Sequence, residues 1–422
     1  MGKVVVIGGG WSGIAAAICA KKQGQEVVLL EKTDLLLGLG NVGGIMRNNG
    51  RFTATEENIA LGANELFDIT DKLSVHRNIE FPGHKHASFY DVNKVESEVR
   101  RLVNKMDIEV KFKTRVVDVL KKNGLEAVQT AEDKYVEGDA FVEATGTSGP
   151  MGNCSKYGNG CSMCVLRCPS FGPRVSLTEK AGLVDLFAMR EDGARGAFSG
   201  SCKLDKSTLS KKLRKILEKD GYAVVPLPES LVNKDKLDKK VCKQYALDEF
   251  AKNVILIDTG CAKLMTPYFD LDDLRTVEGF EDVRYVDPYA GGKGNSIRYM
   301  SVGLRDEYMR AKGLVNLFLA GEKSGFFVGH TEAITTGSLA GYNAARMIDG
   351  LGMLKLPESL SVGAILTYAM KALESEDSMK RRFTFAGGEF FEYMVNNNLY
   401  STDVKNIRKK VKEAGLLNIY NS

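Results

Sequence analysis

Three glycines near the start of the chain, Gly8, Gly10 and Gly13, follow the spacing G-x-G-x-x-G and constrain the fold more than any other feature. The apolar run at 4–7 before them predicts a buried strand, and the run at 14–22 after them predicts a helix. In such a turn the first glycine permits the tight bend and the second lets the backbone approach a pyrophosphate. The third lets the helix pack closely on the strand. We therefore expect a dinucleotide-binding strand–turn–helix unit.

A second apolar run at 27–30 predicts the next strand of this unit, which leads into Glu31 and Lys32. An acidic residue at about this distance beyond the glycines is suited to bond a ribose hydroxyl. The free N–H groups at the start of the helix would face the phosphates. An ordinary strand–turn–helix corner is the alternative, but the combination of strand, helix and acid favours dinucleotide binding. Glu31 and Lys32 are therefore cofactor candidates.

Length and composition limit the classes of protein that this chain can be. A chain of 422 residues can hold two domains, or one large domain with an insertion. We expect no membrane span, because no long apolar run lacks charges, and no signal peptide, because the first strand begins almost at once. The net charge of +4 permits an acidic partner without arguing for one. We expect a cytoplasmic protein, and a homodimer is one option for its assembly.

A glycine-rich loop follows the second predicted strand. Its glycines are Gly38, Gly40, Gly43 and Gly44. The loop is either a flexible crossover or a segment that lies against a flat cofactor ring, where side chains would not fit. In the second case, three polar residues could contact the cofactor or the substrate: Arg47, Asn48 and Asn49.

Two further strand ends carry small residues that could border the same cofactor. A strand predicted at 135–145 ends in Ala144, Thr145 and Gly146. Another, predicted at 314–320, leads through a glycine-bearing loop into a helix. The cofactor candidates there are Gly321, Glu322, Gly329, Glu332 and Thr335. Two strand-to-helix points suit an extended dinucleotide, with the phosphates at the first and the ribityl chain and ring near the second. This favours FAD over NAD.

Four of the eight cysteines crowd into one short segment with the spacing C-x6-C-x2-C-x3-C-P. They are Cys154, Cys161, Cys164 and Cys168, and Pro169 follows the last. In a cytosolic chain such a group indicates a metal or redox site rather than structural disulfides. Four thiolates suit a [4Fe–4S] cluster, and the final Cys-x3-Cys-Pro copies the end of a bacterial ferredoxin run. A Zn2+ site, a thiol redox pair and an inert buried helix face are the alternatives.

Other reactive side chains give weaker signals. Cys202 and Cys261 each follow a turn and could be reactive thiols; with Arg47 they are the catalytic candidates. His84 and His86 share a loop flanked by glycine and proline. They indicate either a metal pair without identified partners or a loop that faces solvent or substrate.

Two basic helices are predicted, at 203–219 and at 402–414. A solvated face is the ordinary explanation of such lysines, and a surface for RNA or an acidic protein is the alternative. No RNA-binding motif with interleaved aromatic residues supports RNA binding by the first helix.

Four segments resemble the GidA/TrmFO group of flavoproteins, which modify uridines in tRNA or rRNA. One is 8–31, and a second is Asn41–Ile45, which is similar to the family segment NPAIGGI. A third is 296–309, which leads into LFLAGE at 317–322, and the last is 329–346, which is similar to the family run GY-x-E-A…G-x-x-AG-x-NAA. The resemblance implies an FAD-binding fold with RNA as a partner. It also implies that the C-terminal helix could contact tRNA, as the C-terminal helices of GidA proteins do.

The chain departs from that family pattern in two places. TrmFO enzymes carry a cysteine in the loop after the second strand, whereas this chain has none between Cys19 and Cys154. This argues against folate-dependent uracil methylation. The four-cysteine cluster is also foreign to the pattern, which suggests a paralogue that transfers electrons.

These observations predict a doubly wound α/β fold, a Rossmann-type, glutathione-reductase-like FAD-binding domain with an inserted α+β domain. The predicted FAD-binding domain comprises 1–150 and 299–355. The inserted domain, 151–298, opens with the cysteine loop, and 356–422 form a helical tail.

The function expected first is an oxidoreductase that exchanges electrons between bound FAD and a [4Fe–4S] cluster. Its electron donor or acceptor would be NAD(P)H or a redox protein. The alternative is an FAD-dependent enzyme that modifies uridine in RNA, such as a folate/FAD-dependent methyltransferase. A third hypothesis replaces iron with zinc and leaves the flavin chiefly to stabilise the fold.

Overall fold

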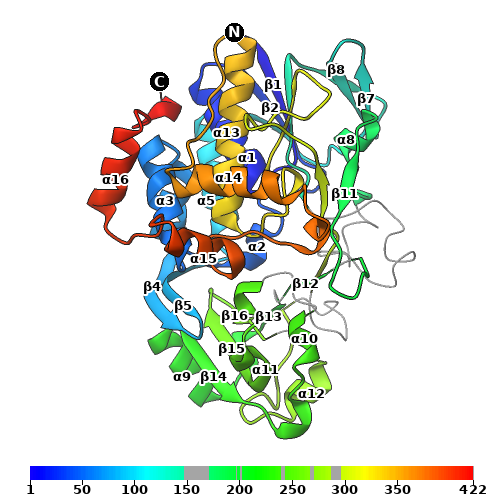
Figure 1. Cartoon of the computed structure of the whole chain (residues 1–422). Coiled ribbons are helices and arrows are strands. Elements are labelled where there is room, and N and C mark those ends of the chain that lie inside the picture. The colour runs from blue at the N-terminus through cyan, green and yellow to red at the C-terminus, as the bar shows by residue number, and fades with distance from the viewer. Residues whose placement is uncertain are drawn as a thin grey trace.

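The computed structural model describes residues 1–146, 171–195, 197–199, 202–238, 243–266, 270–286 and 296–421. Figure 1 shows a larger part that holds both chain ends and a smaller part built from the middle of the chain. Among the described residues, none of the helices combines the length and the apolar character that a membrane crossing needs.

A five-stranded parallel sheet forms the centre of the larger part, with the order β19-β10-β1-β2-β6. Its strands are β1 (Lys3–Ile7), β2 (Glu26–Leu30), β6 (Glu109–Lys111), β10 (Ala140–Glu143) and β19 (Leu317–Leu319). Because parallel strands need crossover connections, their carboxyl ends meet at one edge of the sheet. This arrangement confirms the predicted Rossmann-type α/β fold.

Two helices cover one face of the sheet: α1 (Trp11–Lys22) and α13 (His330–Ile348). They lie side by side in Figure 1. Two glycines of α13 make this approach close: a Cβ on Gly337 would lie 2.1 Å from the Ser12 carbonyl oxygen, and one on Gly341 would lie 2.1 Å from that of Ala16. Any larger residue at these two positions would push the helices apart.

The other face of the sheet packs on a second, three-stranded sheet of β7 (Val116–Lys121), β8 (Leu125–Thr130) and β9 (Tyr135–Glu137). The single strand predicted at 135–145 is therefore two strands, β9 and β10, which belong to different sheets. Gly138 lies between them, where a Cβ would be 2.6 Å from Val5 Cγ2.

A hairpin layer connects the parallel sheet to the middle of the chain. It contains β3 (Ile45–Met46), β5 (His84–Tyr90) and β4 (Ser74–Phe81), in that order. The helices around it are α2 (Gly40–Gly43), α3 (Gly50–Leu61), α4 (Glu65–Lys72) and α5 (Val95–Lys105).

The smaller part contains an antiparallel sheet in the order β13-β16-β15-β14. Its strands are β13 (Cys202–Leu204), β14 (Tyr222–Pro226), β15 (Asn253–Asp258) and β16 (Ala262–Leu264). Its helices are α9 (Lys211–Asp220), α10 (Asp235–Asp238), α11 (Asp248–Lys252) and α12 (Leu271–Arg275). A separate apolar core, which includes Leu213 and Leu217 of α9, holds it together. The predicted domain limits at 150, 298 and 355 stay predictions.

The lysine-rich helix predicted at 203–219 is wrong in its first half, because α9 begins only at Lys211. Lys203 and Leu204 belong to β13 instead. Two capping side chains divide the run: Asp205 accepts a hydrogen bond from Ser207 N, and Ser210 accepts one from Leu213 N. Such caps favour a helix start over a continuous helix.

Further helices and short strand pairs lie outside these sheets. They are α8 (Leu177–Lys180), the strand pair β11 (Asp185–Phe187) and β18 (Ser301–Gly303), the pair β12 (Ala197–Ser199) and β17 (Ser296–Arg298), and the helices α14 (Ser361–Ala372), α15 (Gly388–Asn396) and α16 (Val404–Glu413). The helix predicted at 402–414 is thus confirmed as α16, which lies at the outside of the molecule in Figure 1.

Candidate functional site

The glycine turn between β1 and α1 has the close backbone contacts that its spacing predicts. Gly8 has a φ of +106°, and a Cβ there would lie 2.4 Å from the Ala144 carbonyl oxygen. A Cβ on Gly13 would lie 1.8 Å from the Gly8 carbonyl oxygen. At Gly10, in contrast, a Cβ would meet no atom of the described residues within 4 Å. The outer side of the turn is therefore open to a ligand, while the inner side is closed by packing.

Glu31 stands beside this turn and is buried. Its Oε2 accepts a hydrogen bond from Gly9 N at 2.8 Å, and its Oε1 accepts bonds from the backbone and the hydroxyl of Thr33, both at 2.8 Å. The carboxylate is thus held next to the glycine turn. This agrees with the prediction from the spacing between the glycines and Glu31. Lys32 Nζ, from the next residue, donates to the Gly172 carbonyl at 3.1 Å.

The end of β10 lies at the same edge of the sheet, and its last residue, Glu143, is fully buried. Glu143 accepts hydrogen bonds from Leu177 N at 2.8 Å and Thr178 N at 3.0 Å, the first residues of α8. Ala144 contacts Gly8 as described, while Thr145 donates its hydroxyl to Glu143 at 3.1 Å. Gly146 follows with a φ of +71°.

A buried lysine after β19 was missed in the sequence. Lys323 Nζ lies 2.6 Å from Asp185 Oδ2 and 2.8 Å from Ser176 Oγ. Although burial favours the neutral acid, the Lys323 ammonium and two hydroxyl donors hold the pKa of Asp185 below its usual value. The only hint in the sequence is the position of Lys323, directly after the predicted pair Gly321-Glu322.

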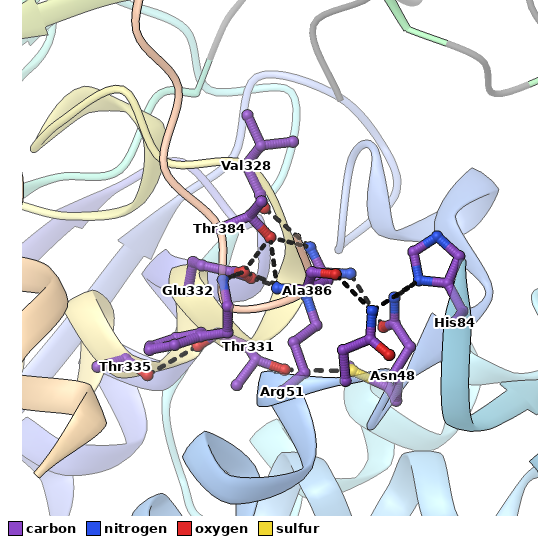
Figure 2. Close-up of polar contacts among 12 residues, drawn as sticks. Asn48, Arg51, His84, Val328, Thr331, Glu332, Thr335, Thr384 and Ala386 are labelled. Carbon is purple, nitrogen blue, oxygen red and sulfur yellow. Dashed lines mark hydrogen bonds and ion pairs between the residues drawn. The ribbon is translucent and has the colours of Figure 1, made fainter. Parts of the chain in front are cut away.

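The start of α13 is held by a buried ion pair, which Figure 2 shows with its polar neighbours. Arg51 Nε of α3 donates to Glu332 Oε1 at 3.1 Å, and Arg51 Nη2 donates to the Val328 carbonyl at 2.8 Å. Glu332 Oε1 also accepts bonds from Thr384 Oγ1 at 2.7 Å and Phe385 N at 2.9 Å. Glu332, predicted as a cofactor residue, is thus turned toward α3 and the C-terminal segment.

Two other cofactor candidates of this segment, Thr335 and Gly329, contact residues of α13 and α3. Thr335 donates to the Thr331 carbonyl and accepts a bond from Asn58 Nδ2, both at 2.8 Å. Gly329 has a φ of +140° at the N-terminus of α13, and a Cβ there would lie 2.0 Å from Arg51 Nη2.

His84 is buried, which contradicts the expectation of a loop that faces solvent or substrate. Asn48 Nδ2 lies 3.1 Å from His84 Nδ1, and His84 Nε2 lies 3.1 Å from the Gln244 carbonyl oxygen. These contacts fit a neutral ring that donates from Nε2 and accepts at Nδ1. His86 instead contacts Asn78 Oδ1 at 3.2 Å.

The glycine loop after β2 forms the short helix α2, at the junction with the smaller part (Figure 1). A Cβ on Gly43 would lie 1.7 Å from His330 Cε1, and one on Gly44 would lie 2.4 Å from Thr259 Cγ2. Lys263 Nζ donates to the Gly43 carbonyl. The loop is therefore enclosed by α13 and by the β15–β16 turn.

The three catalytic candidates differ in their surroundings. Cys261 is buried in the β15–β16 turn, with its Sγ 3.6 Å from Asn93 Oδ1. Arg47 is bound by carboxylates on neighbouring helices: its Nη2 lies 2.6 Å from Asp71 Oδ2, and its Nη1 contacts Glu56. Cys202 lies in β13, and its side chain is outside the described part.

The predicted iron–sulfur or zinc ligands Cys154, Cys161, Cys164 and Cys168 lie outside the described residues. Within the described ranges, no group of three or more His, Cys, Asp or Glu side chains is arranged to hold a metal ion.

Comparisons with known proteins agree with the fold of the chain. The model of the family described as glucose inhibited division protein A matches residues 3–263 and 259–352. Two structures of GidA from Aquifex aeolicus align with TM-scores of 0.66 and 0.63, at 15% and 14% identity. The first alignment covers 98% of this chain and 76% of that chain. At such identity these alignments show the fold.

Curated relatives match over shorter stretches. The protein called methylenetetrahydrofolate–tRNA-(uracil-5-)-methyltransferase TrmFO from Fervidobacterium nodosum is 39% identical over 83 residues, which is 20% of this chain and 19% of that protein. TrmFO of Thermotoga maritima is 33% identical over 96 residues, 23% of this chain and 21% of that protein. The chain thus spans about a fifth of the length of these relatives. The family match covers most of the chain, and the chain belongs to the glucose inhibited division protein A (GidA) family.

Proposed function

We propose that the protein binds FAD along the carboxyl edge of its parallel sheet and is a flavoenzyme that modifies RNA. The observation that carries the FAD proposal is the glycine turn, closed on its inner side at Gly8 and Gly13 and open at Gly10, beside the fixed carboxylate of Glu31. A dinucleotide needs such an open backbone and an acceptor for its ribose. The residues present therefore fit the cofactor.

The side chains that would hold FAD come from several strand ends. The glycine turn and the N-terminus of α1 suit the pyrophosphate, and Glu31 suits the ribose. Lys32 and the strand-end candidates of β10 and β19 extend this edge: Ala144, Thr145, Gly146, Gly321 and Glu322. Gly43 and Gly44 would lie against the ring. FAD would supply the two-electron chemistry, while the protein would orient the substrate and exclude water.

RNA is the substrate class that the relatives favour. The TrmFO proteins named above are tRNA uracil methyltransferases by name. Among the three catalytic candidates we favour Cys261, because the turn that carries it also places Thr259 against Gly44 and Lys263 against Gly43. Arg47 is engaged by two carboxylates and is less suited to meet a substrate.

The test uses the full chain loaded with FAD and a uridine-containing tRNA transcript. We expect flavin absorbance in the purified protein, and a modified uridine when a reductant and methylenetetrahydrofolate are supplied. Cys261→Ala should retain the flavin and lose the product, whereas the matched variant Cys19→Ala should keep both. Flavin-loaded protein that neither retains the transcript at low salt nor changes any uridine would refute the RNA activity.

A second function is favoured by the four-cysteine run: electron exchange between FAD and a [4Fe–4S] cluster on Cys154, Cys161, Cys164 and Cys168. NAD(P)H or a redox protein would then be the electron partner. Metal analysis and a visible spectrum of anaerobically purified protein test it. About four irons per chain, with broad absorbance beneath the flavin bands, would support the cluster. One zinc per chain, or no metal, would reject it.

The cluster assignment can be checked by one substitution. Cys164→Ala should remove the iron and the broad absorbance while the flavin remains bound. Cys242→Ala, at a cysteine outside the cluster spacing, is the matched control and should change neither.

A further inference from the structure

Two lysines of the smaller part reach the same glycine loop. Lys203 of β13 and Lys263 of β16 are directly opposite partners in the antiparallel register. Lys203 Nζ donates to the Asn41 carbonyl at 3.3 Å, and Lys263 Nζ donates to the Gly43 carbonyl. The two side chains, here called the lysine pair, therefore lie on one face of the sheet and converge on α2.

This arrangement is unfavourable by itself. Like charges directly opposite each other on neighbouring strands repel. Lys263 is 4% exposed, and burial of an ammonium group loses hydration. Among the described residues, Lys203 has no carboxylate within ion-pair distance.

The loop also meets the positive end of a long helix. His330 is the first residue of α13, and its ring contacts Gly43 so closely that a Cβ there would lie 1.7 Å from His330 Cε1. The N-terminus of a helix carries a partial positive charge. The lysine pair and the α13 N-terminus therefore act on the same loop from two sides and make the local potential positive.

We infer that the lysine pair raises the reduction potential of FAD bound against this loop. The inference rests on the proposed function, in which Gly43 and Gly44 lie against the ring. A flavin that takes up two electrons and one proton gains a negative charge. Positive charges close to the ring in a site of low dielectric stabilise that charge, and charge near the ring is one means by which proteins tune flavins. The lysine pair thus favours the reduced cofactor.

The experiment measures the midpoint potential of the FAD-loaded full chain, by slow reduction with dithionite in the presence of a reference dye. We expect Lys263→Met and Lys203→Met each to shift the potential to a more negative value, and the double variant to shift it further. Lys263→Arg, which keeps the charge, should restore most of the wild-type value. Lys215→Met removes the same charge from the exposed face of α9 and should leave the potential unchanged.

A purely structural role of the lysines predicts a different result. Loss of the hydrogen bonds to α2 alone would lower the thermal midpoint and the retention of oxidised FAD, while the potential of the bound flavin would stay the same. That result in Lys203→Met, whose side chain is only half buried, would overturn the inference even if Lys263→Met fails to fold. A wild-type chain that takes up no FAD would overturn the proposed function together with the inference. Bound FAD with unshifted potentials would overturn the inference alone.

Discussion

Glu57 Oε2 accepts a hydrogen bond of 2.6 Å from the hydroxyl of Ser361, a residue 304 positions later in the chain. Ser361 N and Val362 N also donate to this carboxyl group, each at 3.0 Å. A buried side chain of α3 therefore caps the N-terminus of α14, whose first N–H groups have no partner within the helix.

This cap predicts that stability depends on pH. Burial raises the pKa of Glu57 from 4.5 to about 7, against the opposing effect of its hydrogen-bond donors. Because the folded-state pKa lies above the unfolded one, the folded protein holds the proton more tightly. The resulting stabilisation is full below about pH 4.5 and is lost as the pH rises through about 7. The whole change should be about 3 kcal/mol.

Urea unfolding between pH 5 and pH 8 measures this effect. In Glu57→Gln the side chain cannot ionise, so the decline in unfolding free energy over this range should largely disappear. The exposed Glu392→Gln should leave the wild-type decline in place. A decline of the same size in Glu57→Gln would assign the pH dependence to other groups.

The glycine turn predicts that two similar substitutions have separate effects. In Gly13→Ala the new Cβ would lie 1.8 Å from the Gly8 carbonyl oxygen, so α1 must move away from β1. Such overpacking should cost about 1–3 kcal/mol of stability. In Gly10→Ala the Cβ meets no atom within 4 Å in the part of the chain that the structure describes, so stability should barely change. FAD affinity should nevertheless fall by about tenfold or more, since the methyl group would occupy the side that we propose to face the phosphates.

Thermal unfolding without added flavin and FAD titration of the two variants measure these effects. Unchanged FAD affinity in a folded Gly10→Ala would place the pyrophosphate elsewhere and contradict the proposed cofactor site.

The buried ion pair at the start of α13 predicts a strong and non-additive effect. Arg51→Met leaves the fully buried Glu332 carboxylate without its cation and should destabilise the protein by about 3–5 kcal/mol. In the double variant Arg51→Met/Glu332→Gln the side chain at position 332 is neutral, and its carbonyl oxygen can still accept hydrogen bonds from Thr384 Oγ1 and Phe385 N. The double variant should therefore recover part of the lost stability. A double-mutant cycle of urea unfolding gives the coupling. Additive losses would show that the two groups act independently.

Local patterns in the sequence predicted the part of the site that lies close together in the chain. Gly8 and Gly13 are separated by few residues, and their spacing alone implies the close backbone contacts found. The strands and helices with clear apolar runs, such as β1 and α16, were predicted for the same reason. These elements carry their own periodicity and end signals.

The contacts that were missed join residues far apart in the chain. Arg51 and Glu332 are 281 positions apart, and Lys263 and Gly43 are 220 apart. No local spacing records such pairs, so the ion pair of Glu332 was not predicted, and His84 was wrongly placed in a loop that faces solvent or substrate. The error at 203–219 had another cause: the lysine and leucine pattern suited a helix, while the caps at Asp205 and Ser210 decided where it begins.

The last prediction concerns α16, whose exposed face is basic. Ile407 and Val411 are buried, while Lys405, Arg408 and Lys412 are exposed. If these cations bind the phosphates of an RNA substrate, changing all three to Glu should weaken tRNA binding for every sequence. Each lost phosphate contact should also reduce the slope of log affinity against log salt by about 1. Stability should change little, because the apolar face of α16 is kept.

A control with the same change in net charge separates local contacts from the overall field. The exposed lysines Lys105, Lys122 and Lys180, changed together to Glu, alter the charge of the protein by a similar amount at positions outside α16. Filter binding at several salt concentrations should then show a nearly unchanged slope for this control and a reduced slope for the α16 variant. Equal slopes for both variants would mean that α16 contributes only to the general charge of the molecule and is a packed helix with a solvated face.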